Sequence, residues 1–512
     1  MVSAKIGFSN FPILIGNRSV IAGKALRTMH GMGIPVILPY TALEGTSNGN
    51  VVMPWLLNKS LFLSAHEIPK YSDPKRLVAL AKETQCKAFY PGYGFLSEDP
   101  VTAAAFEAEG IKWIGPSSDI LRIFGDKMVS RKLAEKLGVP VIPGHEFSDV
   151  REANILAGNL IRQAKLRDIS LDMLDSSPEL YHVTAEDWKK YPIRVKAVAA
   201  GGGRGQVVVY APEKLLDAIR QAKHDVKNNA RLDNDQVFLE LDIPRAKHWE
   251  VQIVGDGINV VHMGCRICYM IPGKHQKIIE EGVNPQSEYL SVREKQIMRE
   301  MIEAAITIMR EVKYAGLGTV EFIVDDHGRW YFLEVNPRIQ VEHGPTEFIT
   351  RVHNKTVRLI EEQVKIAAGI PLAYRQKDIS FEGSAIQGRL LSINPETITA
   401  YPNTFTQFVT PVLQEGILWL EDAGLSYGFR NGLLNNYSIS TNYDPMFGKF
   451  VSWAIDRLSA IDGLRLGLSQ FEFGKGVRTS IPFILKVISH PEFRSSNTAI
   501  WAEFPGVILR GQ

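Results

Sequence analysis

The chain has 512 residues, of which 45% are hydrophobic and 22% are charged, as is ordinary for a globular protein with more than one core. Its 58 lysines and arginines nearly balance 56 aspartates and glutamates, which argues against nucleic acid or an anionic membrane as a partner. Three cysteines are too few for a dense disulfide framework. The N-terminus lacks signal-peptide and transit-peptide features, and no apolar run of about 18 residues occurs. We therefore expect a cytoplasmic protein.

The first quarter of the chain alternates apolar runs with helix-like stretches. In chain order, these segments cover residues 13–15, 20–30 and 34–38, a strand that ends at Tyr90, and residues 100–109 and 112–114. The alternation is typical of β-α-β units and a parallel sheet. We predict a doubly wound α/β lobe over residues 1–124.

The pattern changes after this lobe. Over residues 125–376, helices alternate with hairpin-like strands, and a polar helical stretch without a chemical motif predicts a mobile lid at about 145–215. Beyond residue 377, strands dominate and a helix is expected near 457–471. This predicts a smaller, mainly β lobe over residues 377–512.

Two glutamates lie in a hairpin-like segment. Residues 319–334 alternate apolar and other side chains around a turn that we centre on His327–Gly328, so Glu321 is expected directly opposite Glu334. Like charges opposed across strands are destabilising unless a cation lies between them, and such oxygen ligands suit Mg²⁺. Asn336 has the same side-chain direction as Glu334 and would complete the ligand set. The alternative is a solvated hairpin with incidental acids.

A polar row follows the hairpin. Arg338, Gln340 and Glu342 continue the alternation of Glu334 and Asn336, so we expect them on the same side. An arginine can hold an oxyanion or carboxylate, and a nearby glutamate can act as a general base if its pKa is tuned. This row is therefore a candidate wall of an active site.

A glycine run, Gly201–Gly203, lies between the predicted strands 194–198 and 207–210. Such a loop can fold over a triphosphate, because its backbone N–H groups approach closely where no Cβ intervenes. It matches neither a Walker A loop nor a dinucleotide-binding motif, and a plain flexible hairpin is the alternative. Lys196 in the first strand, and Lys127 ahead of a helical segment, offer counter-charges for phosphate.

Eight strings carry a more specific pattern. They are YPGYGFLSED (90–99), IGPSS (114–118), GDK (125–127), VKAVAAGGGRG (195–205), HWEVQ (248–252), HQKIIEE (275–281), TVEF (319–322) and YFLEVNPRIQVEHGPTE (331–347). In order and spacing they resemble the biotin carboxylase family of ATP-grasp enzymes, over nearly the whole chain. The RIQVEH string with the upstream HQK is specific to biotin-dependent carboxylases within that superfamily.

The resemblance implies a fold and a reaction. The fold is a Rossmann-like pre-ATP-grasp lobe, a central ATP-grasp domain with a mobile lid, and a C-terminal biotin carboxylase lobe. In the reaction, ATP with Mg²⁺ or Mn²⁺ phosphorylates bicarbonate to carboxyphosphate, and biotin is carboxylated at its ureido nitrogen. Because no biotinylation motif occurs, we expect biotin on a separate carrier protein or domain, with a carboxyltransferase as a further partner and a homodimer as the assembly.

The resemblance also implies residue roles. ATP would be held by Lys127, Lys196, Gly201, Gly202, Gly203, Glu240, His248 and Gln276. The divalent metal would be held by Glu321, Glu334 and Asn336. Bicarbonate would be fixed by Lys277, Arg338, Gln340 and Val341 and deprotonated by Glu342, while Arg338 would also stabilise the biotin enolate. Arg389 would lie near phosphate and biotin, and Tyr93 and Gly94 would line the biotin side.

One segment departs from the family pattern. Where the family has GERDCSIQRRHQK, residues 264–277 read GCRICYMIPGKHQK, one residue longer and without an acidic pair and an arginine pair. Two alternatives therefore accompany the carboxylase hypothesis. The first is a catalytically impaired pseudoenzyme that binds nucleotide or a carboxylase partner, and the second is a different ATP-grasp ligase. The final carboxyl acceptor stays open between an acyl-CoA, pyruvate and urea.

Overall fold

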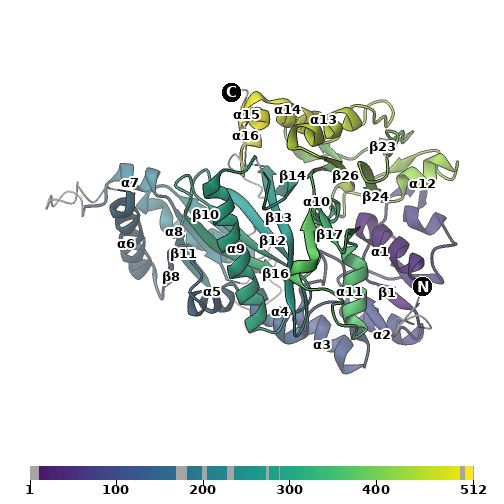
Figure 1. Cartoon of the computed structure of the whole chain (residues 1–512), viewed down its shortest axis with the longest axis horizontal. Helices are drawn as coiled ribbons and strands as arrows, with labels where there is room; N and C mark the ends of the chain where they lie inside the picture. Colours follow the sequence, from purple (N-terminus) through teal and green to yellow (C-terminus); the bar gives the residue numbers. More distant parts are fainter. Residues whose placement is uncertain are drawn as a thin grey trace.

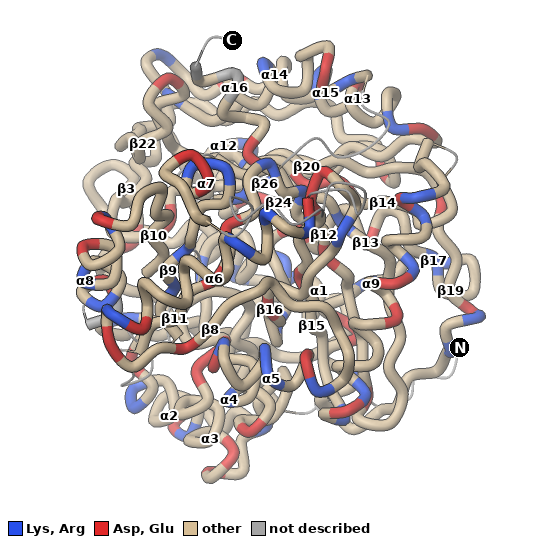
Figure 2. The backbone as a smooth tube through the Cα atoms, turned by 90° about the vertical axis from the view of Figure 1, so that its left-hand side faces the viewer, with Lys and Arg blue, Asp and Glu red and all other residues tan. Residues whose placement is uncertain are grey.

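The computed structural model describes residues 11–168, 182–198, 205–227, 236–271, 276–287, 289–495 and 502–510. Three main sheets organise these residues, and the four-stranded one, with α6, α7 and α8, projects from the rest at the left of Figure 1. Basic and acidic residues are interspersed over the molecule in the view of Figure 2, consistent with the near-zero net charge. None of the described helices combines the length and the apolar composition that a membrane span requires.

The first lobe has a parallel five-stranded sheet in the order β5-β2-β1-β6-β7. Its strands are β1 (Ile13–Ile15), β2 (Val36–Tyr40), β5 (Ser64–Glu67), β6 (Ala88–Tyr90) and β7 (Lys112–Trp113). Its helices are α1 (Ser19–Gly31), α2 (Pro74–Glu83), α3 (Pro100–Ala108) and α4 (Ser118–Gly125). The predicted α/β alternation is confirmed. Strand β5 was not predicted, because its sequence SAHE contains no apolar run.

The second sheet is antiparallel, in the order β10-β9-β11-β8. We call it the lid sheet, because three of its four strands fall largely within the predicted lid range. Its strands are β8 (Gly144–Glu146), β9 (Ile193–Ala197), β10 (Gln206–Val209) and β11 (Val237–Leu241), and its helices are α6 (Val150–Asp168), α7 (Ala185–Lys190) and α8 (Leu215–Lys227). Apolar side chains of these helices and strands form a core of their own. The two strands predicted on either side of the glycine run are confirmed as β9 and β10, which pair with Lys196 opposite Gln206.

The central sheet is antiparallel and has eight strands in the order β16-β15-β12-β13-β14-β20-β26-β24. They are β12 (Lys247–Asp256), β13 (Val260–Ile271), β14 (Gln276–Val283), β15 (Ala315–Val324), β16 (Trp330–Asn336), β20 (Ser384–Leu391), β24 (Leu418–Asp422) and β26 (Met446–Ala454). Because β14 pairs with β20, one sheet runs across the predicted boundary at 376/377. The boundaries at 124/125 and 376/377 and the lid range 145–215 stay predictions.

Helices cover this sheet. The long helix α9 (Val292–Glu311) begins at a capping box formed by Ser291 and Glu294 and packs against β12 and β13. Further helices are α5 (Lys127–Lys136), α10 (His343–Ile349), α11 (Leu359–Ala367) and α13 (Arg457–Leu468). The helix predicted near 457–471 is therefore confirmed. The helices α12 (Leu425–Arg430), α14 (Ile481–Ser489), α15 (Pro491–Ser495) and α16 (Pro505–Arg510) were not predicted.

The β15–β16 hairpin pairs Glu321 with Glu334, as predicted. The predicted turn is wrong by half a residue: Val324 pairs with Trp330, so the turn is centred on His327. An irregularity in the ladder beside Glu321 shifts the register by one residue, as a β-bulge does. This shift brings the two carboxylates opposite each other.

Candidate active site

A cavity of about 1560 Å³ lies where the three lobes meet. All predicted site residues within the described ranges line it: Tyr93, Gly94, Lys127, Lys196, Glu240, His248, Gln276, Lys277, Glu321, Glu334, Asn336, Arg338, Gln340, Val341, Glu342 and Arg389. The predicted glycines Gly201, Gly202 and Gly203 lie outside the described residues.

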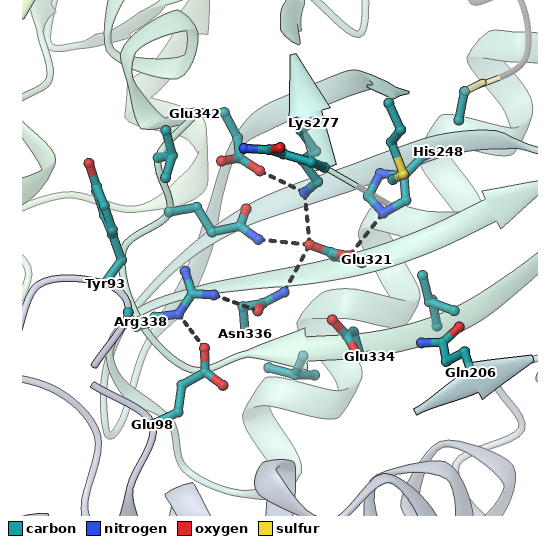
Figure 3. A pocket seen from close by; sticks show the side chains of 18 of the residues that line it. Tyr93, Glu98, Gln206, His248, Lys277, Glu321, Glu334, Asn336, Arg338 and Glu342 are labelled. Carbon is teal, nitrogen blue, oxygen red and sulfur yellow. Dashed lines mark hydrogen bonds and ion pairs between the residues drawn. The ribbon is translucent and has the colours of Figure 1, made fainter. Parts of the chain in front are cut away.

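Lys277 on β14 lies among three carboxylates. Its ammonium donates to Glu321 at 2.9 Å and to Glu342 at 2.6 Å (Figure 3). It also donates to Glu250 at 2.7 Å. Burial alone would lower the pKa of Lys277, but Cys268 and the three carboxylates raise this pKa well above its usual value. Lys277 is therefore a fixed positive charge at neutral pH.

Glu321 accepts hydrogen bonds from three further side chains. His248 Nε2 lies at 2.9 Å, Asn336 Nδ2 at 2.8 Å and Gln340 Nε2 at 2.7 Å from its carboxylate (Figure 3). Burial raises the pKa of Glu321, but Lys277 and His248 together hold it well below its usual value. This carboxylate is therefore ionised and held in one orientation.

Glu334 differs from its cross-strand partner. Among the described residues, none donates a hydrogen bond to its carboxylate. Burial and then Glu321 raise the pKa of Glu334, against the opposing effect of Lys127. A carboxylate without a partner, a second carboxylate opposite it and the amide oxygen of Asn336 are ligands that suit Mg²⁺. The residues therefore fit a divalent metal ion.

Glu342 lies between two cations. One carboxylate oxygen accepts from Lys277, and the other accepts from Arg389 Nη2 at 3.1 Å. Burial raises the pKa of Glu342, but the combined effect of Lys277, Arg389 and Arg266 outweighs burial, so the pKa lies below its usual value. Arg389 is held in turn by Glu280, at 2.5 Å from its Nε, and Gln387 donates to Glu280 at 3.0 Å.

The prediction that the polar row beyond Asn336 continues the strand is wrong. Strand β16 ends at Asn336, Pro337 follows, and Glu342 is the residue that precedes α10. Proline cannot donate to a strand ladder, which explains where the alternation stops. Arg338 instead reaches the first lobe, where its Nε donates to Glu98, and its Nη2 donates to Asn336 Oδ1 at 3.0 Å (Figure 3).

Two lysines line the lid side of the cavity. Lys196 forms an ion pair with Glu240 at 2.5 Å, and both side chains are buried. Lys127 is the first residue of α5, whose N-terminus is capped by Asp126. Burial and Lys196 lower the pKa of Lys127, against the effect of Glu334. An anion bound here would stabilise the charged form of Lys127.

The loop after β6 supplies Tyr93 and Gly94. Asn17 Nδ2 donates to the carbonyls of Pro91 at 2.7 Å and Tyr93 at 2.8 Å, and so holds the loop. Gly94 has φ +72°, a left-handed conformation that favours glycine. The Tyr93 hydroxyl is buried and has no hydrogen-bond partner within the described ranges.

Sequence reasoning missed Arg266 on β13. Its fully buried guanidinium donates to the side chains of Glu250, Gln252, Thr319, Gln340 and Thr346. Arg266 thereby orients Glu250 and Gln340, which bind Lys277 and Glu321. The available signal was a single arginine within residues 263–271, which contain no other charged side chain, since a charge is buried only where it is paired.

The chain is similar to known proteins over nearly its whole length. Family models match "Biotin carboxylase, N-terminal domain" at residues 11–121, "Carbamoyl-phosphate synthase L chain, ATP binding domain" at 168–375 and "Biotin carboxylase C-terminal domain" at 423–501. Two solved biotin carboxylase structures, one from Hydrogenobacter thermophilus 2-oxoglutarate carboxylase with MgADP, ADP and bicarbonate, and one from Campylobacter jejuni, each share 29% identity and a TM-score of 0.78. Both cover 96% of this chain, which spans 96% and 97% of theirs.

Two curated relatives differ in how much of their own length this chain spans. Biotin carboxylase 1 of Bacillus subtilis is 31% identical over 489 residues, covering 94% of this chain and 96% of the relative. The alpha subunit of the mitochondrial methylcrotonoyl-CoA carboxylase of Mus musculus is 31% identical over 504 residues, covering 96% of this chain, which spans only 61% of that relative. By its similarity to these proteins, the chain belongs to the biotin carboxylase family.

Proposed function

We propose that this chain catalyses the ATP- and Mg²⁺-dependent carboxylation of biotin by bicarbonate through carboxyphosphate. The observation that carries the proposal is Glu342, a buried carboxylate between Lys277 and Arg389, in the same cavity as the carboxylate pair Glu321 and Glu334. Phosphoryl transfer to a weak nucleophile requires cations around the transferred group and a base beside the nucleophile. This cavity offers both.

The nucleotide would occupy the lid side. Lys127, Lys196 and His248 line that side, with Gln276 at the start of β14, and the run Gly201–Gly203 would cover the phosphates. A phosphate would compete with Glu240 for Lys196, because a doubly charged oxyanion attracts the ammonium more strongly than one carboxylate. Bound Mg²⁺ or Mn²⁺ would neutralise phosphate charge as a Lewis acid, and Glu321, Glu334 and Asn336 would hold it.

Bicarbonate would lie beside Lys277 and Gln340, with Arg338 and the Val341 N–H as further donors. Glu342 would take its proton. In this structure the cations lower the pKa of Glu342, which makes this carboxylate a weak base. An anion that accepts hydrogen bonds from Lys277 and Arg389 would draw these cations away from Glu342. The base would thereby become stronger when its substrate is bound.

The partners follow from the same reaction. The propionyl-CoA carboxylase alpha chain of Ruegeria pomeroyi is a relative, and in the solved pyruvate carboxylase of Rhizobium etli the similar region makes up 39% of a longer chain. These names support a biotin carrier protein or domain and a carboxyltransferase as partners of this chain, and the Hydrogenobacter structure is described as a dimer. A homodimer and a cytoplasmic location are part of the proposal, although some relatives are named mitochondrial or chloroplastic.

The proposal is tested by measuring ADP release with Mg²⁺, bicarbonate and free biotin. We expect ATP cleavage that requires bicarbonate and increases with biotin. A folded sample that binds nucleotide but shows no bicarbonate-stimulated, biotin-dependent cleavage would instead support the pseudoenzyme alternative.

The metal site makes a separate prediction. Glu334→Gln should raise the Mg²⁺ concentration for half-maximal activity by about tenfold or more, since it removes one of two charged ligands. Titration of Mg²⁺ at saturating ATP measures this concentration. Glu303→Gln is the matched control, because Glu303 is exposed on α9. An Mg²⁺ dependence equal to that of the control would show that Glu334 is not a ligand.

A further inference from the structure

A second cluster of charges, two buried and two half-buried, adjoins the segment that carries Glu342. Lys24 of α1 forms ion pairs with Glu347 of α10 at 2.5 Å and with Glu421 of β24 at 2.6 Å. Lys449 of β26 pairs with Glu421 at 2.9 Å. The two lysines balance the two glutamates, so the cluster is neutral. It joins a helix of the first lobe to the central sheet and to α10.

The cluster also contacts the segment that carries Glu342. Lys449 Nζ donates to the carbonyl of Val341 at 2.7 Å. His343 Nδ1 lies 2.6 Å from the carbonyl of Gln340. A carbonyl oxygen can only accept, so the proton of the imidazole is on Nδ1. Two consecutive backbone carbonyls, one on each side of Val341, are therefore fixed by buried side chains.

The state of His343 supports this assignment. The ring is fully buried, and its Nε2 has no hydrogen-bond partner among the described residues. Burial, and then Lys24 and Lys449, hold the pKa of His343 well below its usual value. The imidazole is therefore neutral near pH 7, with a single N–H that is directed at the Gln340 carbonyl.

Fixing these carbonyls also fixes the neighbouring N–H groups. The peptide group is planar and trans, so the Val341 N–H points opposite to the Gln340 carbonyl that His343 holds. Among the described residues, none accepts a hydrogen bond from this N–H, and Val341 lines the cavity. The second fixed peptide plane joins Val341 to Glu342. It determines the position of the Glu342 Cα atom, from which the side chain extends.

We propose that Lys449 and His343 are positioning residues, which hold the Val341 N–H and the Glu342 carboxylate in the geometry that bicarbonate requires. This inference rests on the proposed function. The bridge of Lys24, Glu421 and Glu347 holds Lys449 in place and ties the first lobe to the same point. Buried ion pairs often stabilise a fold no better than apolar residues do, so geometry explains this cluster better than stability does.

Two pairs of variants test the role of each side chain. Asparagine at 343 places an amide N–H near the position of Nδ1, whereas glutamine places it near Nε2. His343→Gln and Lys449→Met should each raise KM for bicarbonate by about tenfold, the effect of misplacing one N–H donor, with KM for ATP nearly unchanged. His343→Asn and Lys449→Arg should recover most of the affinity for bicarbonate.

Arg457→Met is the matched control. Arg457 forms a buried pair with Glu281, with two contacts of 2.7 Å, and does not line the cavity. The variant should lower the thermal midpoint and leave KM for bicarbonate unchanged. The inference is overturned if His343→Gln and Lys449→Met behave like this control, or if their KM for ATP rises in parallel.

Amide hydrogen exchange separates this inference from the proposed function, because it needs no substrate. Exchange in a peptide covering residues 338–343 should be about tenfold faster in Lys449→Met and in His343→Gln than in wild type, since each loses one anchoring hydrogen bond. It should stay at the wild-type rate in Arg457→Met. Unchanged exchange in the first two variants overturns the inference whether or not the wild type carboxylates biotin.

Discussion

Replacing Glu342 with glutamine is expected to reduce bicarbonate- and biotin-dependent ADP release by about 10²–10⁴-fold, the usual contribution of a general base. Glutamine keeps the size and the hydrogen-bonding shape of the side chain but cannot accept the proton. It also removes the negative charge that Lys277 and Arg389 balance. Affinity for ATP should change little, because Glu342 contacts Lys277 and Arg389 and not the lysines that would hold the nucleotide.

Steady-state kinetics and a nucleotide-binding titration measure the two effects of Glu342→Gln separately. Glu303→Gln again serves as the exposed control on α9. Because the pKa of Glu342 lies below its usual value, its ionised form should dominate throughout the neutral range. We therefore expect no limb of the wild-type pH–rate profile near pH 7 from the free enzyme's Glu342. A variant that retains more than about a tenth of wild-type activity would exclude Glu342 as the general base.

Replacing Lys277 with methionine should have the second large effect, on both activity and stability. The variant leaves the carboxylates of Glu250, Glu321 and Glu342 without their shared cation. Removing one partner of a buried ion pair typically costs about 3–5 kcal/mol. Activity should fall by about 10² or more, since a cation beside the reacting anion is lost.

The cited pKa shifts determine how the stability of the wild type depends on pH. The raised pKa of Lys277 stabilises the fold fully below about pH 10.4, and this contribution is lost as pH rises through the folded-state pKa. The lowered pKa values of Glu321 and Glu342 stabilise it above about pH 4.3, and these contributions are lost as pH falls through the folded-state values. Between these limits Lys277, Glu321 and Glu342 are all charged in the wild type.

In Lys277→Met the carboxylates no longer have the shared cation that balances their charge. Glu321 and Glu342 lose a cation that lowers their pKa values, so these pKa values rise in the folded state and the variant should recover stability as pH falls from 8 to 5. Denaturant unfolding at several pH values measures this recovery. Lys189→Met is the control, because its pair with Glu186 is exposed and such pairs contribute only about 0–1 kcal/mol. Equal stability of Lys277→Met and wild type at every pH would contradict the described network.

Much of the fold could be predicted from local sequence patterns. The alternation of apolar runs and helices predicted the first lobe, and the alternation within residues 319–334 predicted that Glu321 and Glu334 are opposed. That pairing is confirmed, yet the turn is centred differently and an irregularity in the ladder compensates for it. A β-bulge adds one residue to one strand without a compositional signal of its own, so local counting could not have found it.

The contacts that build the site are long-range and were not predictable in this way. Lys277 is 65 residues from Glu342, Arg389 is 109 residues from Glu280, and Arg338 is 240 residues from Glu98. Resemblance to a family brought most of these side chains into one site, but it gave no contacts between them. It also gave no role to Arg266, whose five partners lie on two strands, a loop and a helix that only the folded sheet brings together.

The pairing of β14 with β20 has a consequence for any attempt to divide the protein. A chain cut at residue 376 would lose β20, β26 and β24 and leave the eight residues of β14 as an open strand edge. Such an edge exposes unpaired N–H and C=O groups that template pairing with other chains. Glu280 and Lys277 lie on this same strand, so the excised ATP-grasp segment would be prone to self-association through the strand that carries the central lysine of the site.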